Sequence, residues 1–340
     1  MPYTFAAMRT ATILLLIVAI VAQSSCTKTK SSNPLTLPGN VITYVAGTAG
    51  DTAVYYVNGK EYQLSSGNSP ASANGIALSG SDVYVAGYES NGTLQIAKYW
   101  KNGTAVILSD TTANVIANAI ALIGADVYVA GTIYTNTASA AALWKNGSLT
   151  LLNATGHGGG ANALLASGTD VYVAGYDSTA GQVTACYWKN GVIVTLPDSL
   201  NYARAQSIAI NGTDVYLAGW DRSADGFSFI GPRCWKNGTT IPLATSTKTA
   251  AATSITIASN TIFITGQDNG NSIYWQNGSE NLLTDGNLGN AIAINNGDIY
   301  VAGTSTVLAG SFTSALFWRD GVPIPLSANP SAANAIVITN

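Results

Sequence analysis

His157 is the only histidine of the 340-residue chain, so any serine–histidine–aspartate triad would have to use it. It stands in the glycine-rich stretch "NATGHGGG", where a lone histidine is usually just solvated. The sequence contains no GxSxG, HExxH, CxxC or phosphate-binding loop motif. We therefore assign no catalytic residue and expect a protein that is not an enzyme.

Four carboxylates keep an enzymatic alternative open, because they fall in segments expected to be loops on one side of the fold. Hydrolysis of a glycosidic bond requires two carboxyl groups that face each other across the substrate. A lyase or a glycoside hydrolase is therefore the alternative to a binding protein. The four residues are Glu89, Asp177, Asp221 and Asp268.

The longest irregular segment, Trp220 to Pro232, is the first candidate binding site. It gathers aromatic and charged residues, which together make good contact residues when a loop exposes them. The alternative is an insertion whose aromatic side chains fold back onto the protein. The candidate contacts are Trp220, Asp221, Arg222, Asp225, Phe227 and Phe229.

A second candidate is a series of polar residues that recurs along the chain, where the first strand of each repeat is expected to begin. Side chains of this kind could hold a ligand or waters through amide hydrogen bonds, or they could satisfy the backbone of their own connection. The second interpretation is favoured, because every repeat carries the residue. The series is Asn74, Asn118, Asn162, Gln206, Thr253, Asn290 and Asn334.

Two further recurring residue types have structural interpretations. The tryptophans of the repeats could stack on sugar rings, but a residue present in most units is more often packing between sheets. An aspartate precedes the second strand of most units, which is typical of turn chemistry. These aspartates are spread one per unit, so they predict no calcium site, and we expect no metal and no cofactor. The tryptophans are Trp100, Trp144, Trp188, Trp235, Trp275 and Trp318.

The elements that carry these residues follow from two repeated motifs. "DVYVAG" begins at Asp82 and returns every 44 residues as far as Asp214, with related copies elsewhere. "WKNG" first occurs at Trp100, and its Asn-Gly pair is typical of a two-residue hairpin whose residues both have positive φ. The second unit is accordingly predicted to contain four strands, over 74–78, 82–88, 95–101 and 105–109.

Seven such units predict an all-β fold, a seven-bladed β-propeller with four antiparallel strands per blade. The chain starts with a second strand near Val41 and ends with a first strand at 333–339. We expect this C-terminal strand to complete the first blade and so remove exposed sheet edges. An open solenoid is the alternative, but the divided unit argues against it.

The repeat "ANAIALSGSDVYVAGY…YWKNG" resembles NHL-type and related bacterial β-propeller repeats over nearly the whole mature chain. The resemblance implies the fold, whereas propellers of this kind serve as enzymes, scaffolds and binders. The "WKNG" hairpin departs from the NHL pattern, so no family site residue is carried over. In a propeller the short "SGSD" and "KNG" turns share one face, and the irregular loops share the other. We place binding on that irregular face.

The N-terminus is typical of export. The apolar run from Ala11 to Ala22 is too short to cross a bilayer and is followed by "QSSC", which resembles the lipobox of bacterial lipoproteins. The resemblance implies lipidation of Cys26; ordinary secretory cleavage is the alternative. The predicted domains are a signal peptide (1–25), a flexible tether (26–40) and the propeller (41–340). The expected location is the cell envelope, in the outer membrane facing the periplasm or the surface.

Composition limits the partners. The chain is 47% hydrophobic and 9% charged, with a net charge of −3. It has no basic face for phosphates, which excludes nucleic acid. We expect a monomer that touches the membrane only through its lipid and binds a protein or glycan, with a multivalent lectin as the alternative. Cys186 and Cys234 would lie in sheets about 10 Å apart, too far for a disulfide, so both are expected to be free thiols.

Overall fold

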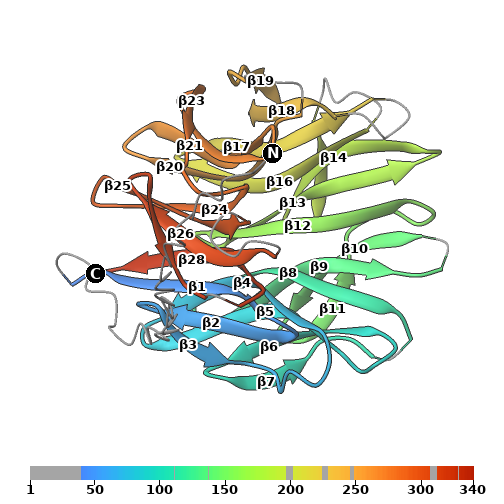
Figure 1. The fold of residues 1–340 in the computed structure, drawn as a ribbon. Helices are drawn as coiled ribbons and strands as arrows, with labels where there is room; N and C mark the ends of the chain where they lie inside the picture. Colours follow the sequence, from blue (N-terminus) through green and yellow to red (C-terminus); the bar gives the residue numbers. More distant parts are fainter. Residues whose placement is uncertain are drawn as a thin grey trace, which may run out of the picture. The chain divides into compact units, whose positions relative to one another are not determined.

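The computed structural model describes residues 40–110, 112–136, 138–196, 202–223, 229–245, 249–306, 312–327 and 329–340. These residues fold into repeated antiparallel β-sheets, consistent with a β-propeller (Figure 1). The predicted signal peptide, Cys26 and the tether up to residue 39 lie outside the described residues. The part of the chain that is described contains no helix that could span a membrane.

Five sheets contain four strands each. The first joins the two ends of the fold as β28 (Ser331–Thr339), β1 (Ile42–Ala49), β2 (Thr52–Val57) and β3 (Lys60–Gln63). The second contains β4 (Ala71–Ser79), β5 (Asp82–Ser90), β6 (Gln95–Lys101) and β7 (Thr104–Ile107). The third contains β8 (Asn114–Ile123), β9 (Asp126–Tyr134), β10 (Ser139–Lys145) and β11 (Ser148–Leu151). The other two contain β20 (Ala251–Ala258), β21 (Thr261–Asp268), β22 (Asn271–Gln276) and β23 (Ser279–Leu282), and β24 (Leu288–Asn295), β25 (Asp298–Ser305), β26 (Ser314–Arg319) and β27 (Val322–Pro325).

The remaining sheet has eight strands and consists of two antiparallel halves. The first half contains β12 (Gly158–Ser167), β13 (Asp170–Thr179), β14 (Gln182–Lys189) and β15 (Val192–Thr195). The second contains β16 (Tyr202–Asn211), β17 (Asp214–Arg222), β18 (Phe229–Lys236) and β19 (Thr239–Ile241). The halves are joined by one parallel pair, Val183 with Tyr202. The seven separate sheets expected from the sequence are therefore five separate sheets and one joined pair.

The first strands of the repeats, which we call the inner strands, contact one another in a closed series. β4 contacts β8, and the contacts continue through β12, β16, β20, β24 and β28 back to β4. The closure depends on the C-terminal strand, because β28 pairs with β1 and places Ile336 opposite Val45 (Figure 1). The predicted pairing of the C-terminal strand with the first strand of the fold is thus confirmed, with β28 starting two residues earlier than expected.

Each inner strand also starts earlier than the sequence suggested and contains a β-bulge. β4 begins at Ala71, and its pairing with β5 skips Asn74, so that Ala73 lies opposite Gly87 and Gly75 opposite Ala86. The same shift occurs in the other inner strands, and the extra residue is always a member of the recurring polar series. Those polar residues are therefore bulge residues inside the strands, not residues at the strand starts.

The glycine of "DVYVAG" makes the bulge possible. A Cβ on Gly87 would lie 1.9 Å from the carbonyl oxygen of Ser72, and one on Gly131 would lie 2.1 Å from that of Ile116. Glycine is needed here because the partner backbone occupies the space of a side chain. The equivalent glycines Gly47, Gly175, Gly219, Gly266 and Gly303 meet the same obstacle.

The "WKNG" turn forms the predicted hairpin between third and fourth strands. Asn102 has φ 49° and Gly103 has φ 83°, and the other copies adopt similar values. Positive φ at both positions is the two-residue turn that matches strand twist.

The core consists of layers between consecutive sheets. On β5, Val83 and Val85 pack toward the preceding sheet, while Tyr84 and Ala86 pack toward the next, so both faces are buried. Six of the layers contain one tryptophan of the repeat, and each of these side chains is at most 1% exposed. The layer between the last sheet and the first has Tyr56 instead, from the degenerate copy "YVNG". The packing interpretation of the tryptophans is therefore confirmed.

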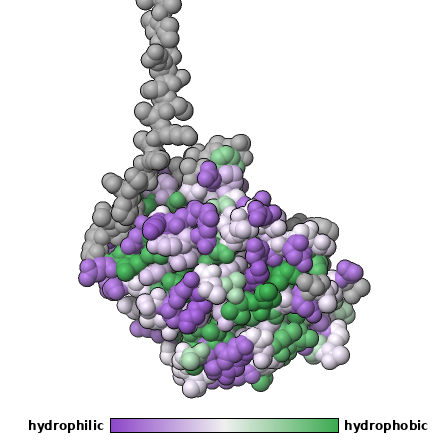
Figure 2. Space-filling view, turned by 90° about the horizontal axis from the view of Figure 1, so that it is seen from below, coloured by the Kyte–Doolittle hydropathy of each residue, from purple (hydrophilic) through white to green (hydrophobic). Residues whose placement is uncertain are grey.

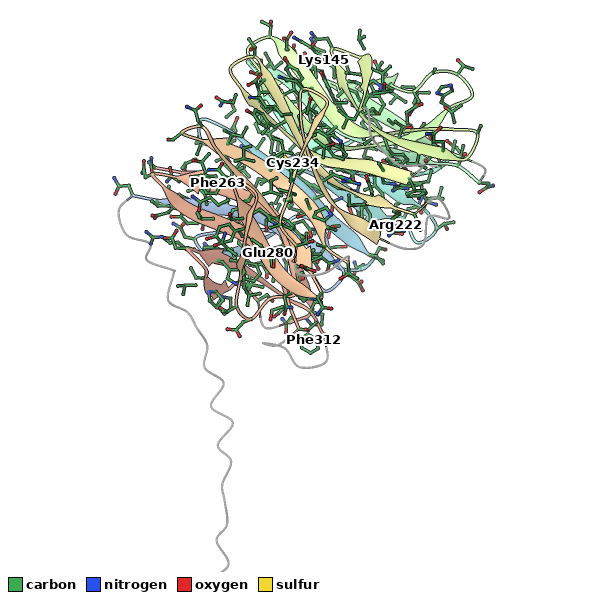
Figure 3. The ribbon with its side chains drawn as sticks, turned by 90° about the horizontal axis from the view of Figure 1, so that it is seen from above. Lys145, Arg222, Cys234, Phe263, Glu280 and Phe312 are labelled. Carbon is green, nitrogen blue, oxygen red and sulfur yellow. The ribbon has the colours of Figure 1, made fainter. Side chains whose placement is uncertain are left out.

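Both cysteines of the described residues are free and buried, as expected from the sequence. Figure 3 shows Cys234 among the side chains between the strands. The exposed apolar side chains lie chiefly on the outermost strands, including Ile107, Leu149 and Val192. On the face drawn in Figure 2, hydrophobic and hydrophilic residues are intermixed.

The bulge geometry predicts a large difference between two glycine substitutions in one sheet. Gly131→Ala should lower the free energy of unfolding by about 3 kcal/mol, because the new methyl group forces the backbone of β8 away from β9. Gly124→Ala is the control, since its φ is +58° but the space around it is open, and it should cost about 1 kcal/mol. Urea denaturation measures both, and equal losses would contradict the bulge argument.

Candidate functional site

A repeated polar arrangement, which we call the clamp, lies at the end of the sheets that carries the two-residue hairpin turns. Asn102 donates from Nδ2 to Asp82 at 2.8 Å and accepts at Oδ1 from the backbone of Val83. Lys101 pairs with the same aspartate at 2.9 Å and lies 5.2 Å from the centre of the Tyr84 ring. Asn102 and then Lys101 hold the pKa of Asp82 below its ordinary value. The repeated aspartates therefore bind the hairpin of their own sheet, and the turn-chemistry interpretation was incomplete.

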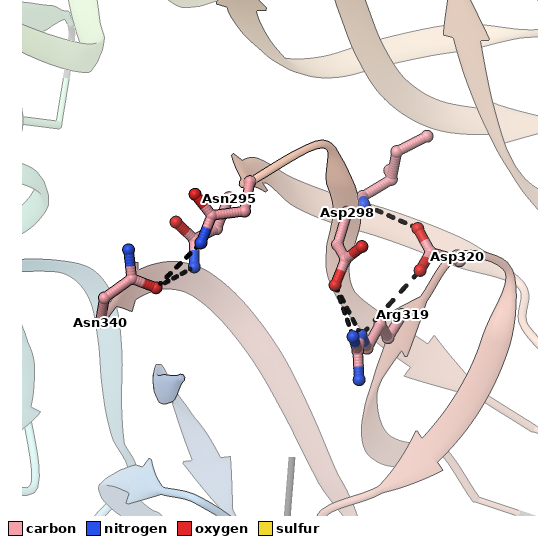
Figure 4. Close-up of polar contacts among 7 residues, drawn as sticks. Asn295, Asp298, Arg319, Asp320 and Asn340 are labelled. Carbon is pink, nitrogen blue, oxygen red and sulfur yellow. Dashed lines mark hydrogen bonds and ion pairs between the residues drawn. The ribbon is translucent and has the colours of Figure 1, made fainter. Parts of the chain in front are cut away.

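The clamp recurs with little change. Asp126, Asp170 and Asp214 each contact the lysine and asparagine of their own hairpin. In the last sheet Arg319 pairs with Asp298, while Asp320 accepts from the backbone of Ile299 (Figure 4). Close by, Asn340 accepts hydrogen bonds from the side chains of two asparagines, Asn295 and Asn296 (Figure 4). The polar groups of this face are thus used within the fold.

The bulge residues form a ring of hydrogen bonds, which we call the amide ring. Asn74 donates to the carbonyl of Ala117 on the next inner strand at 2.9 Å, and Asn118 donates to Ala161 at 2.7 Å. Asn162, Asn290 and Asn334 repeat this contact, and Thr253 donates from its hydroxyl to Gly289. At the Gln206 position, the neighbouring Ser207 accepts from the backbone of Ile255 at 3.1 Å. The ring therefore links adjacent inner strands, rather than satisfying each residue's own connection as we had favoured.

A cavity of about 550 Å³ lies inside the amide ring. All seven bulge residues line it, together with their inner-strand neighbours and Tyr134 at the end of β9. The bulge residues are half-buried, so six of them bond to the next inner strand while all seven still line the cavity. Cavities of this size commonly hold small molecules or the end of a longer ligand. The cavity is therefore the structural centre of a candidate site.

The candidate contacts of the segment 220–232 whose side chains the structure describes do not form one exposed cluster. Trp220 and Arg222 are half-buried on β17, and the Arg222 guanidinium lies 4.9 Å from the Trp220 ring. Asp221 is fully buried and pairs with Arg233 on β18. Phe229 begins β18, while Asp225 and Phe227 lie outside the described residues. Of the candidates whose side chains the structure describes, Trp220 and Arg222 are therefore the two placed where a ligand could touch them.

His157 is held by its neighbours and is not simply solvated. Its Nδ1 lies 2.8 Å from a carboxylate oxygen of Asp177 and 2.9 Å from the hydroxyl of Thr179. The second oxygen of Asp177 accepts from Asn153 at 2.6 Å. In a catalytic triad the acid and the nucleophile contact opposite ring nitrogens. Here both partners contact the same nitrogen, so this arrangement is not a triad.

The four carboxylates of the enzymatic alternative occupy equivalent positions in different repeats, two residues after the bulge glycine. Glu89 pairs with Lys98 at 2.6 Å, Asp177 contacts His157, Asp221 pairs with Arg233, and Asp268 is buried. Glu89, Asp177 and Asp221 are thus each engaged by a basic side chain of their own repeat rather than by one another. Among the described residues, no cluster of three histidines, cysteines or carboxylates could hold a metal ion.

The sequence interpretation missed an aromatic cluster around Arg204 at the edge of the cavity. The Arg204 guanidinium lies 3.9 Å from the ring centre of Tyr176, 5.4 Å from that of Tyr202 and 5.7 Å from that of Trp220. Tyr202 and Trp220 are stacked, with ring centres 6.3 Å apart. The missed signal was positional: Arg204 stands two residues before the bulge residue, where the other repeats have uncharged residues.

The sequence matches no family model and no curated protein. Among solved structures, the chain is similar to one described as the crystal structure of a nidogen/laminin complex. The two are 11% identical, the match covers 68% of this chain and 88% of the other, and the TM-score is 0.43. A likeness of this degree gives no argument about function.

The buried pair on β17 and β18 predicts a pH-dependent stability effect. Burial raises the pKa of Asp221, and Arg233 opposes that shift. Arg233→Met should therefore lower the free energy of unfolding by about 3 kcal/mol at neutral pH, because a buried carboxylate loses its counter-charge. A raised folded-state pKa favours the protonated form in the fold, so the loss should shrink as the pH falls and Asp221 protonates.

Urea denaturation between pH 4 and pH 7 measures this effect. Asp221→Asn combined with Arg233→Met should regain much of the loss, since no charge is then buried. Lys236→Met in the solvent-exposed clamp is the matched control and should change stability little at either pH. An Arg233→Met loss that is independent of pH would contradict the role of Asp221.

Proposed function

We propose that the chain is a lipid-anchored cell-envelope protein whose seven-bladed β-propeller binds a protein or glycan through the face opposite the clamp. We call this the variable face; it carries the loops between second and third strands. The observation that carries the proposal is the difference between the two ends of the sheets. The clamp end repeats the same closed contacts, while the side-chain contacts at the variable end differ from one repeat to the next.

Seven blades follow if the two halves of the eight-stranded sheet count separately. Each half has four strands, an inner strand with its own bulge and a hairpin with its own clamp. A hydrophobic layer containing Leu196 and Trp235 separates the halves, like the layers between the other sheets. The single pair Val183–Tyr202 is then a local contact between two blades.

Single-site binding fits these observations better than a multivalent lectin does. Equivalent sugar sites would need the repeated tryptophans, and those side chains are buried between sheets. Trp220 stands apart, because it is half-buried at the variable end. A lyase or glycoside hydrolase would need two carboxylates at one point, whereas Glu89, Asp177 and Asp221 each pair with a different basic side chain. Recognition by the variable face is therefore the function we propose.

The anchor predicts a change in fractionation. Cys26→Ser should move the protein from the membrane fraction to the soluble fraction, since acyl chains provide the proposed attachment. Cys234→Ser is the control, because it removes a thiol that is buried in the fold. Fractionation of cells that express each variant, followed by immunoblotting, measures the result. Retention of the Cys26→Ser protein on membranes would contradict the anchor.

The binding face predicts which substitutions abolish recognition. The mature protein should bind a ligand on a glycan array or in a pull-down, and Trp220→Ala or Tyr134→Ala should weaken that binding at least about tenfold. Lys145→Ala alters a clamp side chain at the other end of the sheets and should leave binding unchanged. Binding that survives both face substitutions, or that depends on Lys145, would place the ligand elsewhere.

A further inference from the structure

One charged residue interrupts the repeat at the edge of the cavity. Seven positions are equivalent, because the carbonyl of each faces a bulge glycine: Ser72, Ile116, Gly160, Arg204, Ala251, Leu288 and Ala332. Six of these residues are uncharged, and Arg204 is the exception. The fold does not need a charge here, since the same bulge forms without one in every other inner strand.

Neighbouring residues hold the guanidinium in place. Arg204 lies opposite Trp220 in the sheet and stacks on Tyr176 from the preceding repeat at 3.9 Å. The Tyr176 ring has room because position 160 is glycine; a Cβ there would lie 2.6 Å from a ring carbon. One terminal nitrogen of Arg204 donates to the hydroxyl of Tyr202 at 3.0 Å. A guanidinium stacked on aromatic faces keeps its orientation and its ability to bind in a fork geometry.

The charge on Arg204 lacks a carboxylate partner among the described residues, although other charges at the variable end have one. Lys98 pairs with Glu89, and Arg233 pairs with Asp221. The Nε of Arg204 is buried and has no hydrogen-bond partner in the described structure. A half-buried guanidinium that lacks a carboxylate partner favours an anionic group with two oxygens. An anionic ligand bound to Arg204 would therefore explain why this position is charged.

The cluster adjoins the cavity. Tyr134 lines the cavity, is 41% exposed and pairs in the sheet with Ser139, whose hydroxyl lies 3.4 Å from that of Tyr176. On the other side, Gln206 lines the cavity two residues after Arg204. A ligand held by Arg204 would thus meet an exposed aromatic ring and the amide ring together.

We propose that this cluster binds the carboxylate of an acidic sugar, a uronate residue of a glycan, with the sugar ring against Tyr134 or Trp220 and its hydroxyls toward the amide ring. This inference rests on the proposed binding function of the variable face. Arg204, which has no carboxylate partner in the described part of the chain, suits a ligand with one carboxylate at the site and not a polyanion. Neutral amides and aromatic rings suit the hydroxyls and the apolar face of a sugar better than they suit an acidic peptide.

Titration calorimetry with short oligomers of galacturonate, glucuronate and mannuronate tests the proposal. Each acid is compared with its methyl ester, which keeps the ring and removes the charge. At least one acid should bind about tenfold or more tightly than its ester. Trp220 provides a second readout, because the other six tryptophans are buried and only its fluorescence should respond to the sugar.

Substitutions locate the binding energy. Arg204→Gln should weaken binding of the acid at least about tenfold and leave binding of the ester unaffected. Arg204→Lys should bind the acid with an affinity between those of the parent and Arg204→Gln, because lysine keeps the charge but lacks the two parallel donors of a guanidinium. Lys60→Gln is the matched control, since Lys60 lies 5.0 Å from the Tyr62 ring on an outermost strand. Tyr134→Ala tests the site without altering Arg204, in case the arginine variants fold poorly; thermal melts check all variants.

The outcomes are distinct. Acids that bind no better than their esters, or Arg204→Gln that binds the acid as the parent does, would overturn the uronate assignment. Triglutamate that binds more tightly than every sugar acid, with dependence on Arg204, would also overturn it while leaving the variable face as a binding surface. Array or pull-down ligands insensitive to Trp220→Ala and Tyr134→Ala would remove the proposed function itself.

Discussion

The close approach of two backbones at each bulge is the constraint on which the rest of this structure depends. The carbonyl of an inner-strand residue occupies the space that a side chain would need on the second strand, so glycine is required there. The bulge inserts one residue, and that residue reaches the next inner strand with an amide or hydroxyl group. A glycine on one strand thereby determines a hydrogen bond between two sheets. Repeated around the fold, this relation links the inner strands and lines the cavity.

The two ends of the sheets are specialised in opposite ways because their connections differ. At the clamp end each hairpin has two residues, so aspartate, lysine and asparagine come together within a single sheet and satisfy one another. At the variable end the connections differ in length, and strand residues near them meet residues from neighbouring repeats. Arg204 stacked on Tyr176 is one such contact. The repeated clamp contacts stabilise one end of the sheets, whereas the side chains at the variable end differ in chemistry from repeat to repeat.

Much of the fold could be predicted from the sequence, and the reasons are local. Asn102 and Gly103 predict a hairpin, because few residue pairs tolerate positive φ at both positions. The two chain ends each supply part of one four-stranded unit, which predicts their pairing. The start of β4 was placed late, because a bulge interrupts the alternation by which strands are recognised. The joining of two sheets through Val183 and Tyr202 has no sequence signal, since it is one parallel pair between distant residues.

The site was less predictable, because it depends on contacts between strands and between repeats. Asp221 was expected to be exposed beside aromatic residues, but Arg233 holds it in the interior. Arg204 was overlooked because a single arginine in a strand looks ordinary until the repeats are aligned on their bulges. The amide ring was recognised as a series, but its partners lie on the next inner strand, a distance in sequence that no local pattern reveals.

The pairing of β1 with β28 has a mechanical consequence. The segment before Asn40 enters the fold at β1, which is bonded along its length to β2 on one side and β28 on the other. A pull directed along β1 from its N-terminal end would load both ladders in shear. Many backbone hydrogen bonds would then have to break together, so an end held by a neighbour from each side resists extraction better than a strand at an edge would.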